Sequence, residues 1–122
     1  MQVRGHQILC DQPRDNGGDN AGLTPPEFLL AALATCAGYY AAQYLKARNL
    51  STDRLNVKVS AEKAMQPTRL GSFKIEVTVP AVEPRHQDGL LRAVKSCLVH
   101  NMLLHAPAID TALHQLEPSL AT

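Results

Sequence analysis

The sequence has no tryptophan, few other aromatic side chains and almost no net charge. Aromatic residues make up 4% of its 122 residues, and 12 basic side chains stand against 11 acidic ones, for a formal net charge of +1. Leu, Ala, Val and Ile must therefore build the core, and so short a chain has little apolar area to bury, which favours an oligomer. The near-zero charge argues against a nucleic-acid or membrane-surface partner, because clustered Lys and Arg hold both.

Long apolar runs and cysteine-rich motifs are also missing. Without a run of about 18 apolar residues we expect no membrane-spanning segment, and without a signal-peptide pattern at the start we expect a cytoplasmic protein. Three cysteines do not make a disulfide framework. Cys97, His100 and His105 are a minor alternative as a metal site, but no CxxC or HxxxH pair accompanies them, so we expect neither metal nor cofactor.

The hydrophobic pattern predicts a single α+β domain over residues 1–122. In chain order we expect a strand over 2–9, a polar loop over 11–20, a helix over 24–48, strands over 55–61 and 73–79, a helix over 84–105, and over 109–116 a short helix or, as we favour, a strand. Thr24 and Glu27 have capping-box spacing at the start of the first helix. The two central strands alternate apolar with polar residues, and we expect them to pair as an antiparallel hairpin.

Two cysteines lie near the centres of the two predicted helices. Cys36 is close to Gly38, and glycine inside a helix often marks the close approach of another backbone or a ligand. Cys97 lies on the apolar face of the second helix. Buried cysteine is often only a small hydrophobe, so the pattern leaves core filling and a redox pair both open. We interpret Cys10, beside the polar loop, as a bystander.

Two stretches of the sequence together resemble one known family. They are DQPRDNGGDNAGLTPPEFLLAALATC and LLRAVKSCLVHNMLLHAPAI, which resemble the OsmC/Ohr family of osmotically inducible and organic hydroperoxide resistance proteins. The segment Leu98-Val99-His100-Asn101 is similar to the less characterised OsmC-like branch. The resemblance implies an α+β fold in which two subunits intertwine, with antiparallel sheets wrapped around two long central helices per chain.

The resemblance also implies a reaction and the residues that perform it. Cys36 would reduce an organic hydroperoxide and become a sulfenic acid, and Cys97 would resolve it as a disulfide, which a dithiol or a lipoylated protein reduces. Apolar surroundings disfavour a thiolate, so a cation must approach Cys36. Arg14 is the first candidate, ahead of Arg4, with Glu27 as the acid that holds it. A helix cap explains Glu27 equally well, because an ideal helix places it on the face opposite Cys36.

A function of a different class is a non-catalytic OsmC-like homodimer that binds a small apolar ligand between its helices. We expect Gly38, Tyr39, Tyr40 and Met102 to line such a cleft. The thiol geometry separates the two hypotheses. The peroxidase requires two sulfurs close together beside a guanidinium, and the binding protein does not.

Overall fold

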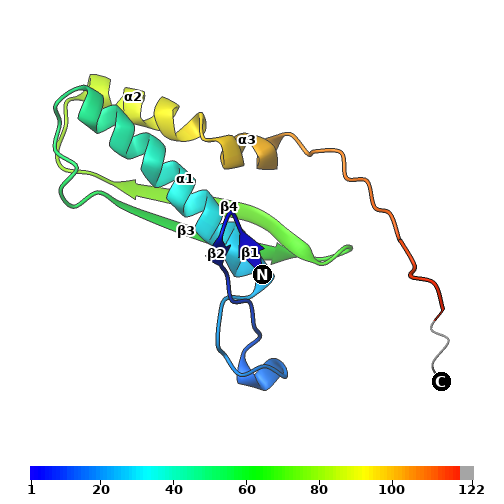
Figure 1. Cartoon of the computed structure of the whole chain (residues 1–122). Coiled ribbons are helices and arrows are strands. Elements are labelled where there is room, and N and C mark those ends of the chain that lie inside the picture. The colour runs from blue at the N-terminus through cyan, green and yellow to red at the C-terminus, as the bar shows by residue number, and fades with distance from the viewer. Residues whose placement is uncertain (119–122) are drawn as a thin grey trace.

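The computed structural model describes residues 1–118 of the chain. Its elements are β1 (Gln2–Val3), β2 (His6–Gln7), the 3₁₀ turn η1 (Arg14–Asn16), α1 (Pro25–Ala47), β3 (Asn56–Ala64), β4 (Arg69–Thr78), α2 (Pro84–Lys95) and α3 (Leu98–Leu104). α1 contacts the β3–β4 hairpin and both shorter helices (Figure 1). The predicted mixed α/β fold with antiparallel strands is confirmed.

α1 begins and ends where local chemistry favours a boundary. Oε1 of Glu27 accepts hydrogen bonds of 2.9 Å from both the backbone nitrogen and Oγ1 of Thr24, which closes the predicted capping box. After the last turn Asn49 has a left-handed φ of 57°, a conformation that Asn adopts more readily than most residues. The expected bounds of this helix are therefore nearly those observed.

The core is small, and one face of α1 supplies most of it. The buried apolar side chains are Leu33, Ala37, Ala41 and Leu45 of α1, Leu90 and Val94 of α2, and Cys97. By length and composition α1 could cross a membrane, but it packs against the sheet and both other helices in the manner of a core helix. Only 22% of its most apolar 18-residue stretch is buried. Much of the apolar surface of α1 is therefore not covered within one chain.

β3 and β4 form the predicted antiparallel hairpin, paired from Asn56 opposite Thr78 to Ala64 opposite Arg69. The strands extend further than the alternating segments because pairing continues past a bulge at Glu62/Lys63. Alternate side chains of each strand are half-buried. The hairpin thus supplies one apolar face, on which α1 lies.

The single helix predicted over 84–105 is wrong, because the structure has two helices there. Oγ of Ser96 donates to the carbonyl of Arg92 at 2.9 Å, and the backbone nitrogen of Cys97 donates to the carbonyl of Val94 at 3.1 Å, so the last turn of α2 tightens to 3₁₀ bonding. Cys97 then takes an extended ψ of 132° and becomes the N-cap of α3. The described part of the chain therefore has one long helix, not two.

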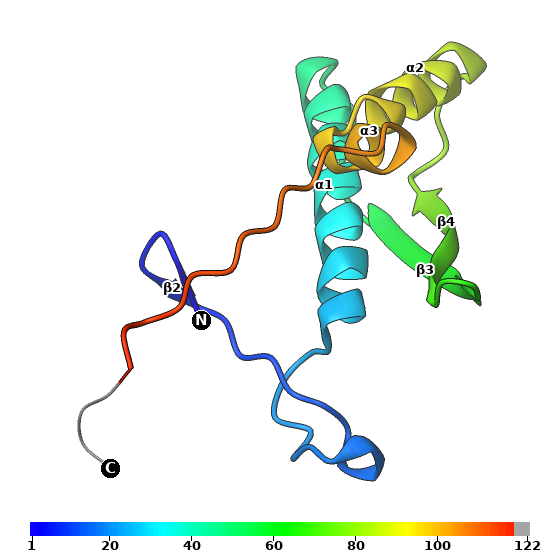
Figure 2. The ribbon, with the colours of Figure 1, turned by 90° about the vertical axis from the view of Figure 1, so that its right-hand side faces the viewer.

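The predictions for both terminal segments are also corrected. Residues 2–9 form not one strand but the two short strands β1 and β2, because Arg4 and Gly5 both have positive φ and make a tight hairpin turn. The segment 109–116 is neither strand nor helix and runs away from the helices (Figure 2). Its apolar side chains Ile109, Leu113 and Leu116 are 85%, 86% and 97% exposed.

Candidate redox site

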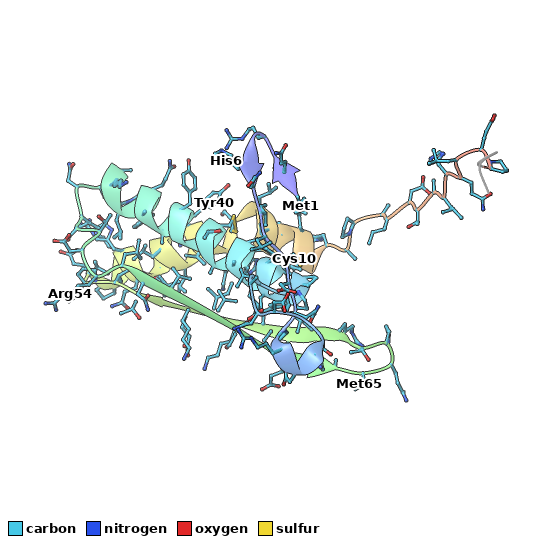
Figure 3. The ribbon with its side chains drawn as sticks, turned by 60° about the horizontal axis from the view of Figure 1, so that its bottom comes forward. Met1, His6, Cys10, Tyr40, Arg54 and Met65 are labelled. Atoms are coloured by element: carbon cyan, nitrogen blue, oxygen red, sulfur yellow. A yellow bond between two sulfur atoms is a disulfide. The ribbon has the colours of Figure 1, made fainter. Side chains whose placement is uncertain are left out.

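Cys36 and Cys97 form a disulfide. Their Cα atoms are 6.0 Å apart although 61 residues separate them in sequence, and this distance is typical of disulfides. α1 supplies Cys36, and the break between α2 and α3 supplies Cys97, so the bond lies in the seam between the helices (Figure 3). The structure therefore contains a cysteine pair, one of the two interpretations that the sequence left open.

The two bonded cysteines differ in exposure. Cys97 is completely buried, whereas Cys36 is half-buried. Cys36 is therefore the more accessible of the two residues to a solvent-borne reactant. The third cysteine, Cys10, is free and exposed, consistent with a bystander.

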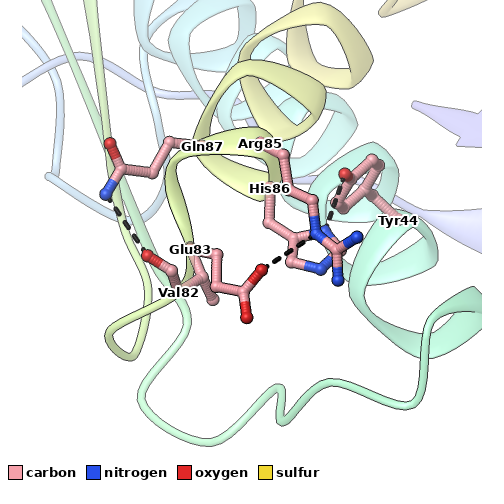
Figure 4. A network of polar contacts seen from close by, with 6 residues as sticks. All are labelled: Tyr44, Val82, Glu83, Arg85, His86 and Gln87. Atoms are coloured by element: carbon pink, nitrogen blue, oxygen red, sulfur yellow. Dashed lines mark hydrogen bonds and ion pairs between the residues drawn. The ribbon is translucent and has the colours of Figure 1, made fainter.

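A cluster around Tyr44 joins α1 to α2 two turns beyond the disulfide. The Tyr44 hydroxyl shares a 3.1 Å hydrogen bond with Nδ1 of His86 (Figure 4), and the guanidinium of Arg48 lies 3.6 Å from the centre of the Tyr44 ring. A Cβ at Gly89 would overlap the phenol. Gly89 therefore permits this close contact between the two helices, and sequence reasoning missed it although a glycine within a predicted helix was the available signal.

Gly38 has no comparable role among residues 1–118. A Cβ there would meet Cγ2 of Val57 at 3.6 Å, an ordinary van der Waals distance. Among residues 1–118, no other backbone therefore approaches Gly38 closely. Two residues expected to line a ligand cleft, Tyr39 and Met102, are exposed.

The polar loop before α1 is organised by Asp11, a residue that sequence reasoning did not single out. Its carboxylate accepts hydrogen bonds from the backbone nitrogens of Gln12, Asp19 and Ala21 at 2.8, 3.1 and 3.0 Å. The bonds from Ala21, Gln12 and Asp19, in that order of size, lower the pKa of Asp11. An Asp at the start of a turn-rich stretch was the available signal.

Arg14 and Glu27 are not gathered around the disulfide. Arg14 begins η1, which lies beyond the N-terminal end of α1 (Figure 2), and its side chain has no ion pair among residues 1–118. Glu27 lies in the first turn of α1, where hydrogen bonds from the backbone and side chain of Thr24 lower its pKa. Their parts in a reaction remain predictions.

A pocket of about 370 Å³ lies between α1, β4 and α3. Its wall includes Leu33, three residues before Cys36, and His100, three residues after Cys97. Nδ1 of His100 is buried and has no hydrogen-bond partner in the described part of the chain. Over those same residues, no group of three His, Cys, Asp or Glu side chains could hold a metal ion.

A sequence model of the OsmC-like protein family matches residues 17–112. The chain belongs to the OsmC family. The resemblance inferred from the loop and the two cysteine-bearing segments is thus confirmed. No curated protein matches this OsmC-like chain in sequence.

Two solved structures resemble this OsmC-like protein in fold. One is an osmotic stress induced and detoxification response protein from Psychrobacter arcticus 273-4, with a TM-score of 0.71 and 20% identity over 80% of this chain and 72% of that one. The other is an organic hydroperoxide resistance protein OsmC from Legionella pneumophila, with a TM-score of 0.53 and 16% identity over 78% of this chain and 72% of that one. At these identities the likeness concerns the fold.

Proposed function

We propose that this OsmC-like protein is a cytoplasmic thiol peroxidase that reduces organic hydroperoxides in oxidative or osmotic stress. The disulfide between Cys36 and Cys97 is the observation that carries the proposal, because a pair that can close can deliver two electrons to a substrate. Family membership supports a redox role. The name of the Legionella pneumophila structure, organic hydroperoxide resistance protein, supports the substrate class.

The proposed reaction assigns its first step to Cys36 because Cys36 is the more exposed of the two cysteines. The thiolate of Cys36 attacks a peroxide oxygen, a sulfur–oxygen bond forms, the oxygen–oxygen bond breaks, and the alkoxide takes up a proton and leaves as an alcohol. The Cys97 thiol then attacks the sulfenic acid, forming the disulfide, while hydroxide leaves with the thiol proton as water. A dithiol or lipoylated protein restores both thiols by exchange and is itself oxidised to a disulfide.

Arg14 is the cation that we propose for Cys36, with Glu27 holding its guanidinium. Within residues 1–118, Glu27 accepts hydrogen bonds from Thr24 through Oε1 only. Its Oε2 therefore remains available to an arginine. Because η1 projects beyond the end of α1, the loop would reach a cysteine pair either by folding back or from a second subunit.

A homodimer is part of the proposal. Apolar side chains are exposed on α1 at Tyr39, on α3 at Leu98 and Met102, and along the extended C-terminal segment. Apolar surface of this extent normally marks an interaction site. A second copy would cover α1, which the hairpin and the shorter helices contact on one face only.

The proposal is tested by measuring consumption of cumene hydroperoxide with dihydrolipoamide as reductant. We expect turnover by the wild type and by Cys10→Ser, loss of turnover in Cys36→Ser, and in Cys97→Ser a sulfenic acid that dimedone traps. A wild type no faster than Cys36→Ser would exclude the peroxidase. Cys10→Ser is the matched control because it removes a thiol outside the pair.

A non-catalytic binding function is the second candidate, favoured by the pocket of about 370 Å³ between α1, β4 and α3 and by the remote position of Arg14. The probe is cumyl alcohol, which has the apolar body of the hydroperoxide without its reactive bond. Binding by calorimetry in both wild type and Cys36→Ser, with no hydroperoxide consumption by either, would establish this function in place of the peroxidase.

A further inference from the structure

Nδ1 of His100 is a buried polar atom to which neither backbone nor side chain offers a hydrogen bond within residues 1–118. Leaving a buried polar group without a partner is costly, so such atoms in folded proteins usually have a partner in some functional state. His100 belongs to neither the cysteine pair nor the loop of Arg14. The site described above therefore does not explain why Nδ1 of His100 is buried without a partner.

The position of His100 relates it to Cys97. Cys97 is the N-cap of α3, and His100 is the third residue of that helix. Side chains at these two positions lie next to each other, as the capping box shows for Ser or Thr with Glu. His100 also shares a pocket wall with Leu33, one turn before Cys36 on α1. His100 thus lies one turn from Cys97 along α3 and lines the same pocket as a residue one turn from Cys36 on α1.

We propose that His100 is the hydrogen-bond partner of the Cys97 thiol in the reduced protein. In the disulfide, the sulfur of Cys97 has no proton to donate. When a dithiol reduces the pair, the sulfur–sulfur bond breaks, both sulfurs gain a proton, and the dithiol is oxidised. The Cys97 thiol then donates to Nδ1 of His100, which gives the buried nitrogen the partner it lacks in the oxidised protein.

The same contact serves the resolving step, and this part rests on the proposed peroxidase function. As the sulfur of Cys97 attacks the sulfenic acid of Cys36, Nδ1 takes the thiol proton. The sulfur–oxygen bond of Cys36 breaks, and His100 returns the proton to the departing hydroxide, which leaves as water. Oxidation then leaves Nδ1 without a partner again, as observed.

Two substitutions of His100 distinguish the loss of the Nδ1 acceptor from the loss of the imidazole ring. In His100→Asn the amide oxygen is placed near the position of Nδ1, whereas in His100→Gln it is placed near that of Nε2. We expect the equilibrium constant for exchange with dithiothreitol to shift about fivefold toward the protein disulfide in His100→Gln, or about 20 mV for a two-electron couple. His100→Asn should stay within about twofold of the wild type, as should the control His105→Gln, whose side chain is exposed.

A direct readout is the ¹⁵N resonance of Nδ1 in wild-type protein, which should move on reduction for His100 and stay in place for His105. An equal redox equilibrium in wild type and His100→Gln, or an Asn variant shifted as far as the Gln variant, would overturn the proposal. So would an unchanged Nδ1 resonance, the result expected if a second subunit supplies its partner. Neither measurement uses a peroxide, so a failed peroxidase assay leaves the thiol contact standing and removes only its part in resolution.

Discussion

The ring of Tyr44 fills the space that any side chain at residue 89 would need, so the absence of a Cβ at Gly89 is what lets α1 and α2 meet. The same two helices continue to the cysteine pair, Cys36 within α1 and Cys97 just after α2. The distance between α1 and α2 at Tyr44 and Gly89 therefore influences the distance between Cys36 and Cys97.

Gly89→Ala should therefore destabilise the protein by about 1–3 kcal/mol through overpacking. Gly38→Ala is the matched control, because its Cβ meets only Val57 at 3.6 Å, and removing a helical glycine should raise stability by about 0.5–1 kcal/mol. Urea unfolding of the oxidised protein measures both. Adding Tyr44→Leu should recover part of the loss in Gly89→Ala, and equal stability of the two glycine variants would contradict the observed contact.

Reducing the disulfide should lower the free energy of unfolding by about 2–4 kcal/mol, because the bond constrains the unfolded chain. The closed loop spans 61 residues, long enough for a large effect. Urea titrations with and without dithiothreitol test this in wild type and Cys10→Ala. Cys97→Ala should show no dependence on reductant, and a wild type equally stable in both conditions would refute the expectation.

Asp11 should hold the loop before α1 closed at neutral pH and release it in acid. Its pKa is lowered in the folded protein, so its stabilising effect is complete above the unfolded carboxyl value of about 3.9 and is lost as the pH falls through the lower folded value. Asp11→Asn should mimic that loss at neutral pH. Tryptic cleavage after Arg14 should then accelerate, while Asp15→Asn, which changes the neighbouring exposed acid, should cleave at the wild-type rate.

The proposed dimer predicts a concentration-dependent sedimentation coefficient. Leu113→Lys combined with Leu116→Lys places charges on the exposed apolar C-terminal segment and should weaken self-association at least about tenfold. Ser60→Lys, on the exposed side of β3, is the control and should associate as the wild type does. A wild type that sediments as a monomer at all concentrations would remove the dimer from the proposal.

Sequence pattern anticipated the parts of this fold that local chemistry determines. The capping box of Thr24 and Glu27 specified the start of α1, and strict alternation specified the β3–β4 hairpin. The break before Cys97 was not visible, because α3 still packs against α1 and the apolar spacing continues across it. Arg4-Gly5 was overlooked as a turn, since nothing in a single alternating stretch shows that it folds on itself.

The sequence predicted the cysteines of the candidate site but not the contacts of its polar groups. Cys36 and Cys97 stood out because each is central in an apolar segment. Asp11 accepts hydrogen bonds from backbone nitrogens up to ten residues away, and Tyr44 forms a hydrogen bond with a residue 42 positions away. Neither contact produces a periodic pattern in the sequence. The position of Arg14 depends on how the loop packs, which composition does not determine.

The exposed thiol of Cys10 gives this protein an internal standard for its own oxidation state. Of the three cysteines, it alone stays outside the disulfide. A thiol-counting reagent should therefore find one group per chain in the unfolded oxidised protein and three after reduction. The ratio of the two counts reports the fraction of closed pairs without any need to know the protein concentration.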